Sequence, residues 1–133
     1  MSFLLRSCFF YLSCLLLAKS LQAQVLLRCY VTYAGQTQII TTSMQASPYE
    51  TRAEDIQGRF RFKPVMVGAA QRIDYIKLYA YFQSRTGDVL IHQASYQPPF
   101  QLQSQEFFFT PENRLYAGPL ERELEYRCSL QNS

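Results

Sequence analysis

Hydrophobic and polar residues alternate along much of the chain after residue 23, a period of two that is typical of β-strands with one buried face. The stretch RIDYIKLYAYF, residues 72–82, shows this pattern from residue 75 on, with apolar residues at the even positions 76–82. The opposite face of this strand carries Tyr75, Lys77, Tyr79 and Tyr81. We expect the face with the even-numbered apolar residues to contact the core. The face with the tyrosines and the lysine is either packed under another part of the chain or a binding surface.

The same pattern predicts about seven short strands separated by turn residues. They span residues 25–33, 36–42, 59–67, 72–82, 88–96, 107–109 and 121–130. Short strands with regular turns favour an all-β fold, an antiparallel β-sandwich of immunoglobulin-like character. A small β-barrel is the alternative.

One segment has the signals of a helix instead. Ser47 has the position of an N-cap, Pro48 that of the first helical residue, and Glu50 lies three residues after the cap. We therefore expect one short helix near residues 48–56, which requires packing against the rest of the fold for its stability.

The glycine-containing loop SRTG, residues 84–87, predicts a hairpin between the strands 72–82 and 88–96. A four-residue loop pairs Tyr81 with Leu90, Tyr79 with His92 and Tyr75 with Tyr96. A five-residue loop shifts the register by one and turns the second strand over. Only the first register brings the histidine to the tyrosines.

Residues 1–23 have the layout of a secretory signal peptide, with Arg6 before an apolar run and small residues near its end. Cleavage after Ala23 is our preferred assignment, and cleavage after Ser20 is the alternative. The apolar run of about 11 residues is shorter than the roughly 20 that a membrane-spanning helix needs, so no membrane span is expected. Lipidation at Cys14 is a second reading of the leader. The rest of the chain, residues 24–133, is expected to form a single domain.

Two cysteines, Cys29 and Cys128, remain after the leader. An even number of cysteines in an exported chain predicts a disulfide, which would place the first and last strands side by side. Two free buried thiols are the alternative. No metal site is expected, because two distant cysteines and a single histidine make no ligand cluster.

Charge and motifs exclude several classes of function. Two of the 13 basic residues lie in the leader, so residues 24–133 carry 11 basic and 10 acidic side chains. This balance does not favour nucleic-acid binding. No phosphate-binding loop is present, and we expect no cofactor.

Catalysis is not expected either. His92 is the only histidine and lies inside a predicted strand, and Glu121, Glu123 and Glu125 form a predicted solvated face. We therefore expect no enzyme activity, and a small hydrolase that uses His92 is the third hypothesis for the function.

These observations favour a non-enzymatic module, periplasmic or secreted, that binds another exported or envelope protein. Such a protein would be an assembly accessory, a chaperone-like factor or an inhibitor. Tyrosine combines apolar area with a polar tip and is enriched at protein interfaces. The candidate binding residues are Tyr75, Lys77, Tyr79, Tyr81 and His92. A carbohydrate or cell-envelope module that stacks its ligand on the same tyrosines is the alternative.

Overall fold

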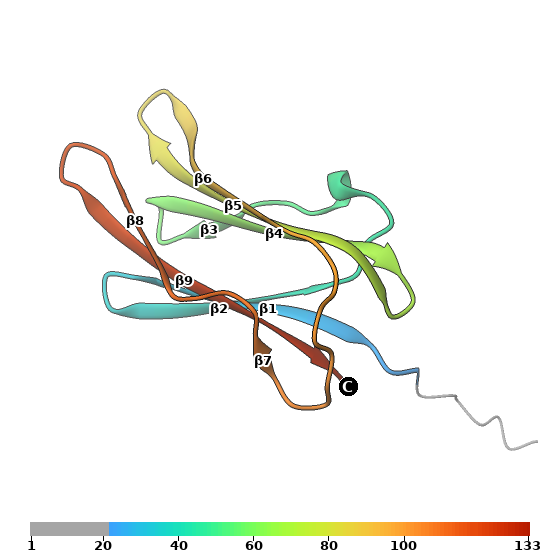
Figure 1. Ribbon diagram of the computed structural model, residues 1–133. Helices are drawn as coiled ribbons and strands as arrows, with labels where there is room; N and C mark the ends of the chain where they lie inside the picture. The colour runs from blue at the N-terminus through green and yellow to red at the C-terminus, as the bar shows by residue number, and fades with distance from the viewer. Residues whose placement is uncertain (1–21) are drawn as a thin grey trace, which may run out of the picture.

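Alternating apolar residues give this chain two antiparallel β-sheets that pack face to face, as the computed structural model of residues 22–133 shows (Figure 1). The β1 sheet contains β1 (Val25–Tyr33), β2 (Gln36–Ser43), β7 (Phe107–Phe108), β8 (Asn113–Ala117) and β9 (Arg122–Asn132). The β5 sheet contains β3 (Glu54–Ile56), β4 (Phe60–Ala69), β5 (Arg72–Ser84) and β6 (Gly87–Tyr96). The leader predicted at residues 1–23 lies outside the described residues, apart from Gln22 and Ala23.

The predicted β-sandwich is confirmed, with nine strands in place of about seven. The additional strands are β3 and β8, which are short and pair with long neighbours. In the described residues the sheets do not close on themselves, which rules out the barrel alternative. Within residues 22–133 no helix is long and apolar enough to cross a membrane.

The terminal strands lie side by side in the centre of the β1 sheet, whose order is β2-β1-β9-β7, with β8 also paired to β9. Cys29 and Cys128 face each other across this pair and form a disulfide, as predicted. In immunoglobulin domains the corresponding bond joins the two sheets, whereas here it lies within one sheet. The finer immunoglobulin-like assignment therefore stays a prediction.

The core fills the space between the sheets with one face of each long strand. The odd residues of β1 from Val25 to Tyr33 are buried, and the even residues of β9 from Leu124 to Leu130 are also buried. Aromatic rings connect the two layers: the Phe62 and Tyr126 ring centroids are 4.8 Å apart. This burial is the main stabilising contribution to the fold.

The helix predicted near residues 48–56 is wrong in extent. Ser47 does act as the cap and accepts a hydrogen bond from the amide of Tyr49, but only one 3-10 turn, η1 (Pro48–Glu50), follows. Thr51 is extended, and the chain then forms β3 on the edge of β4. So short a segment gains more from ladder hydrogen bonds and from burial of Ile56 than from helical turns that bury nothing.

The chain itself covers one edge of the β5 sheet. β3 pairs with residues 60–62 of β4, and Gln45 forms backbone hydrogen bonds with Met66 and Gly68 further along the same edge. Pro64 occupies the gap between these two covered parts. Because proline has no amide hydrogen, it leaves no donor unpaired at this position.

Candidate binding face

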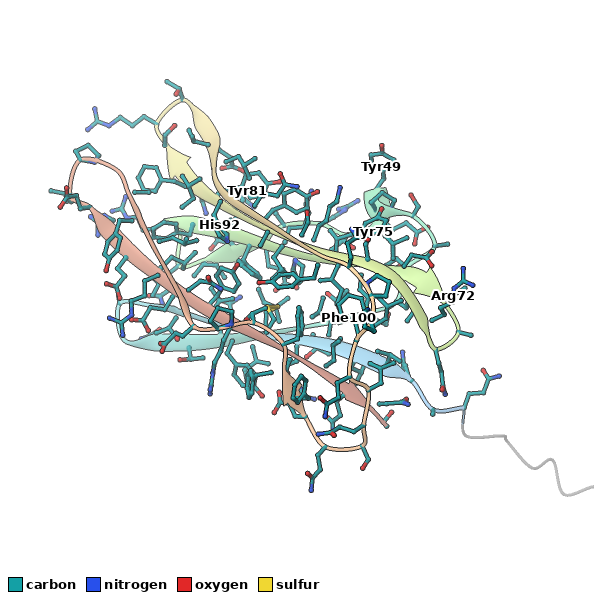
Figure 2. All side chains as sticks on the ribbon, in the orientation of Figure 1. Tyr49, Arg72, Tyr75, Tyr81, His92 and Phe100 are labelled. Carbon is teal, nitrogen blue, oxygen red and sulfur yellow. A yellow bond between two sulfur atoms is a disulfide. The ribbon has the colours of Figure 1, made fainter. Side chains whose placement is uncertain are left out.

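The outer face of the β5 sheet carries the predicted tyrosines. Alternation along β5 directs Ile76, Leu78 and Ala80 into the core, where they are fully buried. The intervening side chains lie on the opposite face of the strand and are half-buried; Tyr75 and Tyr81 are labelled in Figure 2. The intervening residues are Tyr75, Lys77, Tyr79 and Tyr81. Four of the five predicted binding residues therefore lie together on one solvent-facing surface.

A lysine from β4 completes this surface. The antiparallel register sets Lys63 opposite Tyr79 and Arg61 opposite Tyr81. The Lys63 Nζ lies 4.7 Å from the ring centroid of Tyr79 and 5.9 Å from that of Tyr81. These distances allow cation–π attraction to both rings. We call the set Lys63, Tyr75, Lys77, Tyr79 and Tyr81 the tyrosine–lysine face.

The rings of this face support one another. Tyr79 and Tyr81 stack with ring centroids 6.5 Å apart and an interplanar angle of 20°. The Nζ of Lys77 lies 5.3 Å from the ring centroid of Tyr75. Each tyrosine thus has a neighbour that limits its rotation, which lowers the entropy lost when a partner binds.

The face has an excess of positive charge. Arg61 is paired with Asp88, with 3.1 Å between Nε and Oδ2. Neither Lys63 nor Lys77 forms an ion pair with any of residues 22–133. The two ammonium groups are therefore free to meet carboxylates of a partner.

The segment that contains η1 forms one boundary of the face. Val65 and Val67 are buried although they belong to the outward positions of β4 and are not part of the main core cluster. The segment 46–53 lies over this part of the sheet, with Tyr49 92% exposed at its tip (Figure 2). Tyr79 and Tyr81 pair with Lys63 and Arg61, beyond the buried valines along β4, and keep part of their surface exposed.

His92 does not belong to the tyrosine–lysine face, which corrects the predicted register. The hairpin forms and Tyr81 does pair with Leu90, but a bulge places the extra residue Ile91 before His92. As a result His92 pairs with Ala80 in place of Tyr79, and Tyr96 pairs with Ile76 in place of Tyr75. Because a shift of one residue exchanges the two faces of a strand, His92 points toward the core.

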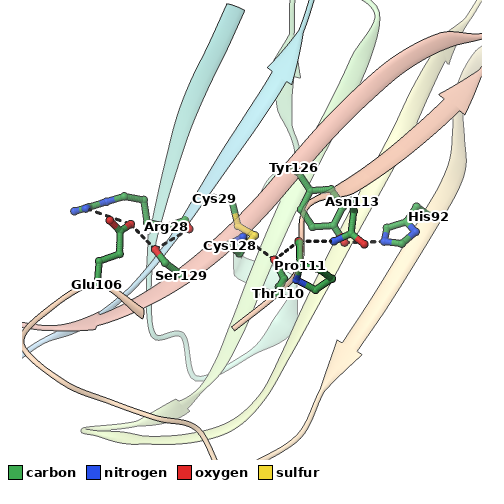
Figure 3. The surroundings of a disulfide bond; sticks show 10 residues. All are labelled: Arg28, Cys29, His92, Glu106, Thr110, Pro111, Asn113, Tyr126, Cys128 and Ser129. Carbon is green, nitrogen blue, oxygen red and sulfur yellow. Dashed lines mark hydrogen bonds and ion pairs between the residues drawn. A yellow bond between two sulfur atoms is a disulfide. The ribbon is translucent and has the colours of Figure 1, made fainter. Parts of the chain in front are cut away.

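His92 makes an inter-sheet hydrogen bond there. Its Nε2 lies 2.7 Å from the hydroxyl of Tyr126, which belongs to β9 (Figure 3). Burial lowers the pKa of His92 and raises the pKa of Tyr126. Both shifts favour a neutral pair. In the part of the chain that the structure describes, no carboxylate hydrogen-bonds to His92, so the carboxylate partner of a catalytic triad has no counterpart here.

The outer face of the β1 sheet carries a different cluster, centred on Glu106. Its carboxylate accepts a hydrogen bond from the hydroxyl of Ser129, and Arg28 lies 3.7 Å away (Figure 3). The hydroxyl of Tyr30 donates a second hydrogen bond to the same carboxylate. Burial raises the pKa of Glu106, but the two hydrogen bonds and the charges of Arg28 and Arg127 outweigh burial and hold that pKa below its ordinary value. The cluster ties the loop before β7 to the sheet. Glu106 lies in an irregular polar loop, so sequence periodicity gave no signal for it.

Metal-ligating side chains do not gather in residues 22–133. These residues hold no group of three or more His, Cys, Asp or Glu side chains arranged to bind a metal ion. Of the glutamates predicted to form a solvated face, Glu121 is exposed in the turn before β9, and Glu123 and Glu125 lie on the outer face of the β1 sheet beside Tyr116 and Arg114. Comparisons with protein-family models, with curated proteins and with solved structures found no match to this chain.

Proposed function

We propose that this protein is a non-enzymatic exported module that binds another protein through the tyrosine–lysine face. The observation that carries the proposal is the pair Lys63 and Lys77, which form no ion pair with residues 22–133 and lie beside three partly exposed tyrosine rings. Aromatic side chains of this kind supply much of the binding energy at protein interfaces. The disulfide supports a location outside the cytoplasm, and we propose the periplasm or the extracellular space.

The partner that fits this face presents carboxylates and apolar side chains together. Carboxylates would meet the two ammonium groups, and apolar side chains would cover the tyrosine rings. A surface that is basic and aromatic selects against basic partners through like-charge repulsion. The partner is therefore expected to be an acidic exported or envelope protein.

The few lysines of the chain allow amine-reactive reagents to target the tyrosine–lysine face. Besides Lys19 in the predicted leader, Lys63 and Lys77 are the only lysines, and both belong to this face. A short amine-reactive crosslinker applied to cells that produce the protein is expected to couple a partner through one of these two side chains. Mass spectrometry of the crosslinked peptides then reports which lysine was used.

Two double variants distinguish binding of the partner protein from its crosslinking to the lysines. Lys63→Arg with Lys77→Arg keeps the charge but removes both amines, so crosslinking should fall while co-purification persists. Tyr79→Ala with Tyr81→Ala keeps the amines but removes the rings, and we expect the affinity to fall by roughly 30-fold or more. Tyr116→Ala is the matched control, because Tyr116 is exposed on the other sheet. A partner that all three variants retain to the same extent would refute the proposal.

In the carbohydrate alternative, a sugar stacks on the tyrosine rings, so the ring faces must be accessible. The Lys63 ammonium group lies over the ring of Tyr79, 4.7 Å from its centroid, so this ring face is not free for a sugar. This contact favours the protein ligand over the sugar. Binding of an envelope polysaccharide that is lost in the Tyr79→Ala and Tyr81→Ala variant would reverse this preference.

A further inference from the structure

The second edge of the β5 sheet, formed by β6, is open. Among residues 22–133, no hydrogen bond outside the β5–β6 ladder involves a backbone atom of residues 88–96. The opposite edge is covered by β3, by Gln45 and by the proline between them. Strand edges that are left unpaired offer a row of backbone donors and acceptors to another chain.

The features that usually protect an edge are largely missing from β6. The strand is ten residues long and contains neither lysine nor proline, and Val89 and Leu90 are 49% and 50% exposed. The bulge at Ile91 and the charged Asp88 at the start of the strand are the protective features. The bulge interrupts a continuous ladder, so pairing with another strand is best accommodated along residues 92–95, which are in register with Lys77–Ala80 of β5.

The open edge is continuous with the tyrosine–lysine face. Gln93 lies opposite Tyr79, and Ser95 lies opposite Lys77, so both share the outer face with these residues. A strand added to β6 would lie about 10 Å from β5 at the ordinary spacing of strands, a gap that one lysine and one glutamate side chain can bridge. Outward side chains of the added strand would thus reach Lys77 of β5, which forms no ion pair within residues 22–133.

The inner side of the β6 edge favours apolar side chains in the added strand. Ala94 and Tyr96 of β6 are partly buried and pack against the core. Inward side chains of an added strand would lie beside them at the rim of the sandwich. An occupant with apolar residues at one set of alternate positions and acidic residues at the other matches both sides.

We infer that the partner binds by adding an extended strand to β6, and that this strand alternates apolar and acidic residues. The inference rests on the proposed function, because it specifies how the partner of the tyrosine–lysine face is held. Backbone hydrogen bonds to β6 supply affinity, and the alternating side chains supply specificity. The strand β2 is also long and lies at a sheet edge, but it belongs to the other sheet and does not adjoin the lysines.

A synthetic peptide of ten residues that alternates valine and glutamate is the probe. We expect it to bind the purified protein and to slow hydrogen exchange of the backbone amides in residues 92–95. The peptide in which lysine replaces glutamate should bind at least roughly tenfold more weakly, because its lysines meet Lys77 with like charge. A version of the first peptide with N-methyl groups at alternate residues, on the edge that would face β6, should not bind.

A variant of the protein tests the same geometry. Gln93→Glu places a carboxylate beside the glutamates of the bound peptide and should weaken its binding by roughly tenfold. Gln36→Glu makes the same chemical change on the exposed start of β2 and should leave binding unchanged. Protection of β2 amides in place of β6 amides, or equal binding of the N-methylated peptide, would overturn the inference.

The outcomes separate the inference from the proposed function. Binding that is lost in Tyr79→Ala but gives no protection of β6 leaves the function standing and refutes strand addition. If the peptide still slows hydrogen exchange of the β6 amides in the Tyr79→Ala and Lys77→Ala variants, strand addition is supported. The same result counts against the tyrosine–lysine face as a binding surface. Absence of peptide binding refutes strand addition. The crosslinking experiment then tests separately whether the tyrosine–lysine face binds a partner. Pairing of β6 with a second copy, seen as a mass that doubles with concentration, would also refute it.

Discussion

The imidazole of His92 and the phenol of Tyr126 are joined by a hydrogen bond of 2.7 Å between Nε2 and Oη, and this bond connects the edge strand β6 to the central strand β9 of the opposite sheet. The two rings also pack against each other, with centroids 5.5 Å apart. The only histidine of the chain is thus a contact between the two layers.

This contact makes stability depend on pH. Burial lowers the pKa of His92, so the unfolded chain binds a proton more readily than the native protein does. The stabilisation is present above the unfolded pKa of about 6.5 and is lost as the pH falls through the lower native value. Burial raises the pKa of Tyr126 and that of Tyr96, which acts on Tyr126, so both phenols stay neutral in this range.

Urea unfolding at pH 8, 6.5 and 5 measures this effect, with His92→Gln as the control. The native protein should lose more stability than the variant between pH 6.5 and 5. Parallel pH profiles of the two proteins would show that His92 does not contribute. An unchanged biological activity in His92→Gln would in addition end the hydrolase hypothesis.

The Cys29–Cys128 disulfide should contribute strongly to stability, because it connects strands that are 99 residues apart in sequence. Replacing both cysteines by alanine is expected to lower the free energy of unfolding by about 4 kcal/mol in the chain-entropy description of such a loop. Guanidinium unfolding of the two proteins measures the difference. Alkylation of both thiols in the native protein before any reductant is added would contradict the bond.

Glu106 is expected to hold the loop before β7 against the β1 sheet. Glu106→Gln removes the charge that accepts hydrogen bonds from Tyr30 and Ser129, and should lower stability by about 1 kcal/mol, since the site is partly exposed to water. Glu121→Gln, at an exposed turn, is the matched control. Equal stability of the two variants would show that the cluster is not a stabilising contact.

Gly68 marks a place where the backbone comes too close to its neighbours for a side chain. A Cβ at this position would collide with the backbone oxygen of Arg72 and would lie 2.7 Å from the sulfur of Met44. Gly68→Ala is therefore expected to destabilise the protein by about 2 kcal/mol, in the range of other overpacked sites. Thermal unfolding measures this loss, and Ala69→Ser on the exposed neighbour should leave the midpoint nearly unchanged.

The amino-acid sequence by itself determined which face of β1, β5 and β9 is buried and which two cysteines are bonded. Alternation is a local property, since successive side chains of any strand point to opposite faces. For that reason Tyr75, Lys77, Tyr79 and Tyr81 could be placed on one surface before the fold was known.

Tertiary structure alone decided where that surface ends and what joins it. One extra residue at Ile91 moved His92 to the core side, and the register between β4 and β5 brought Lys63 over Tyr79 and Tyr81. The same holds for the open edge at β6 and for the covered valines under the η1 segment. These features depend on contacts between residues far apart in the chain, and a shift of a single residue in pairing reverses them, so no local pattern can specify them.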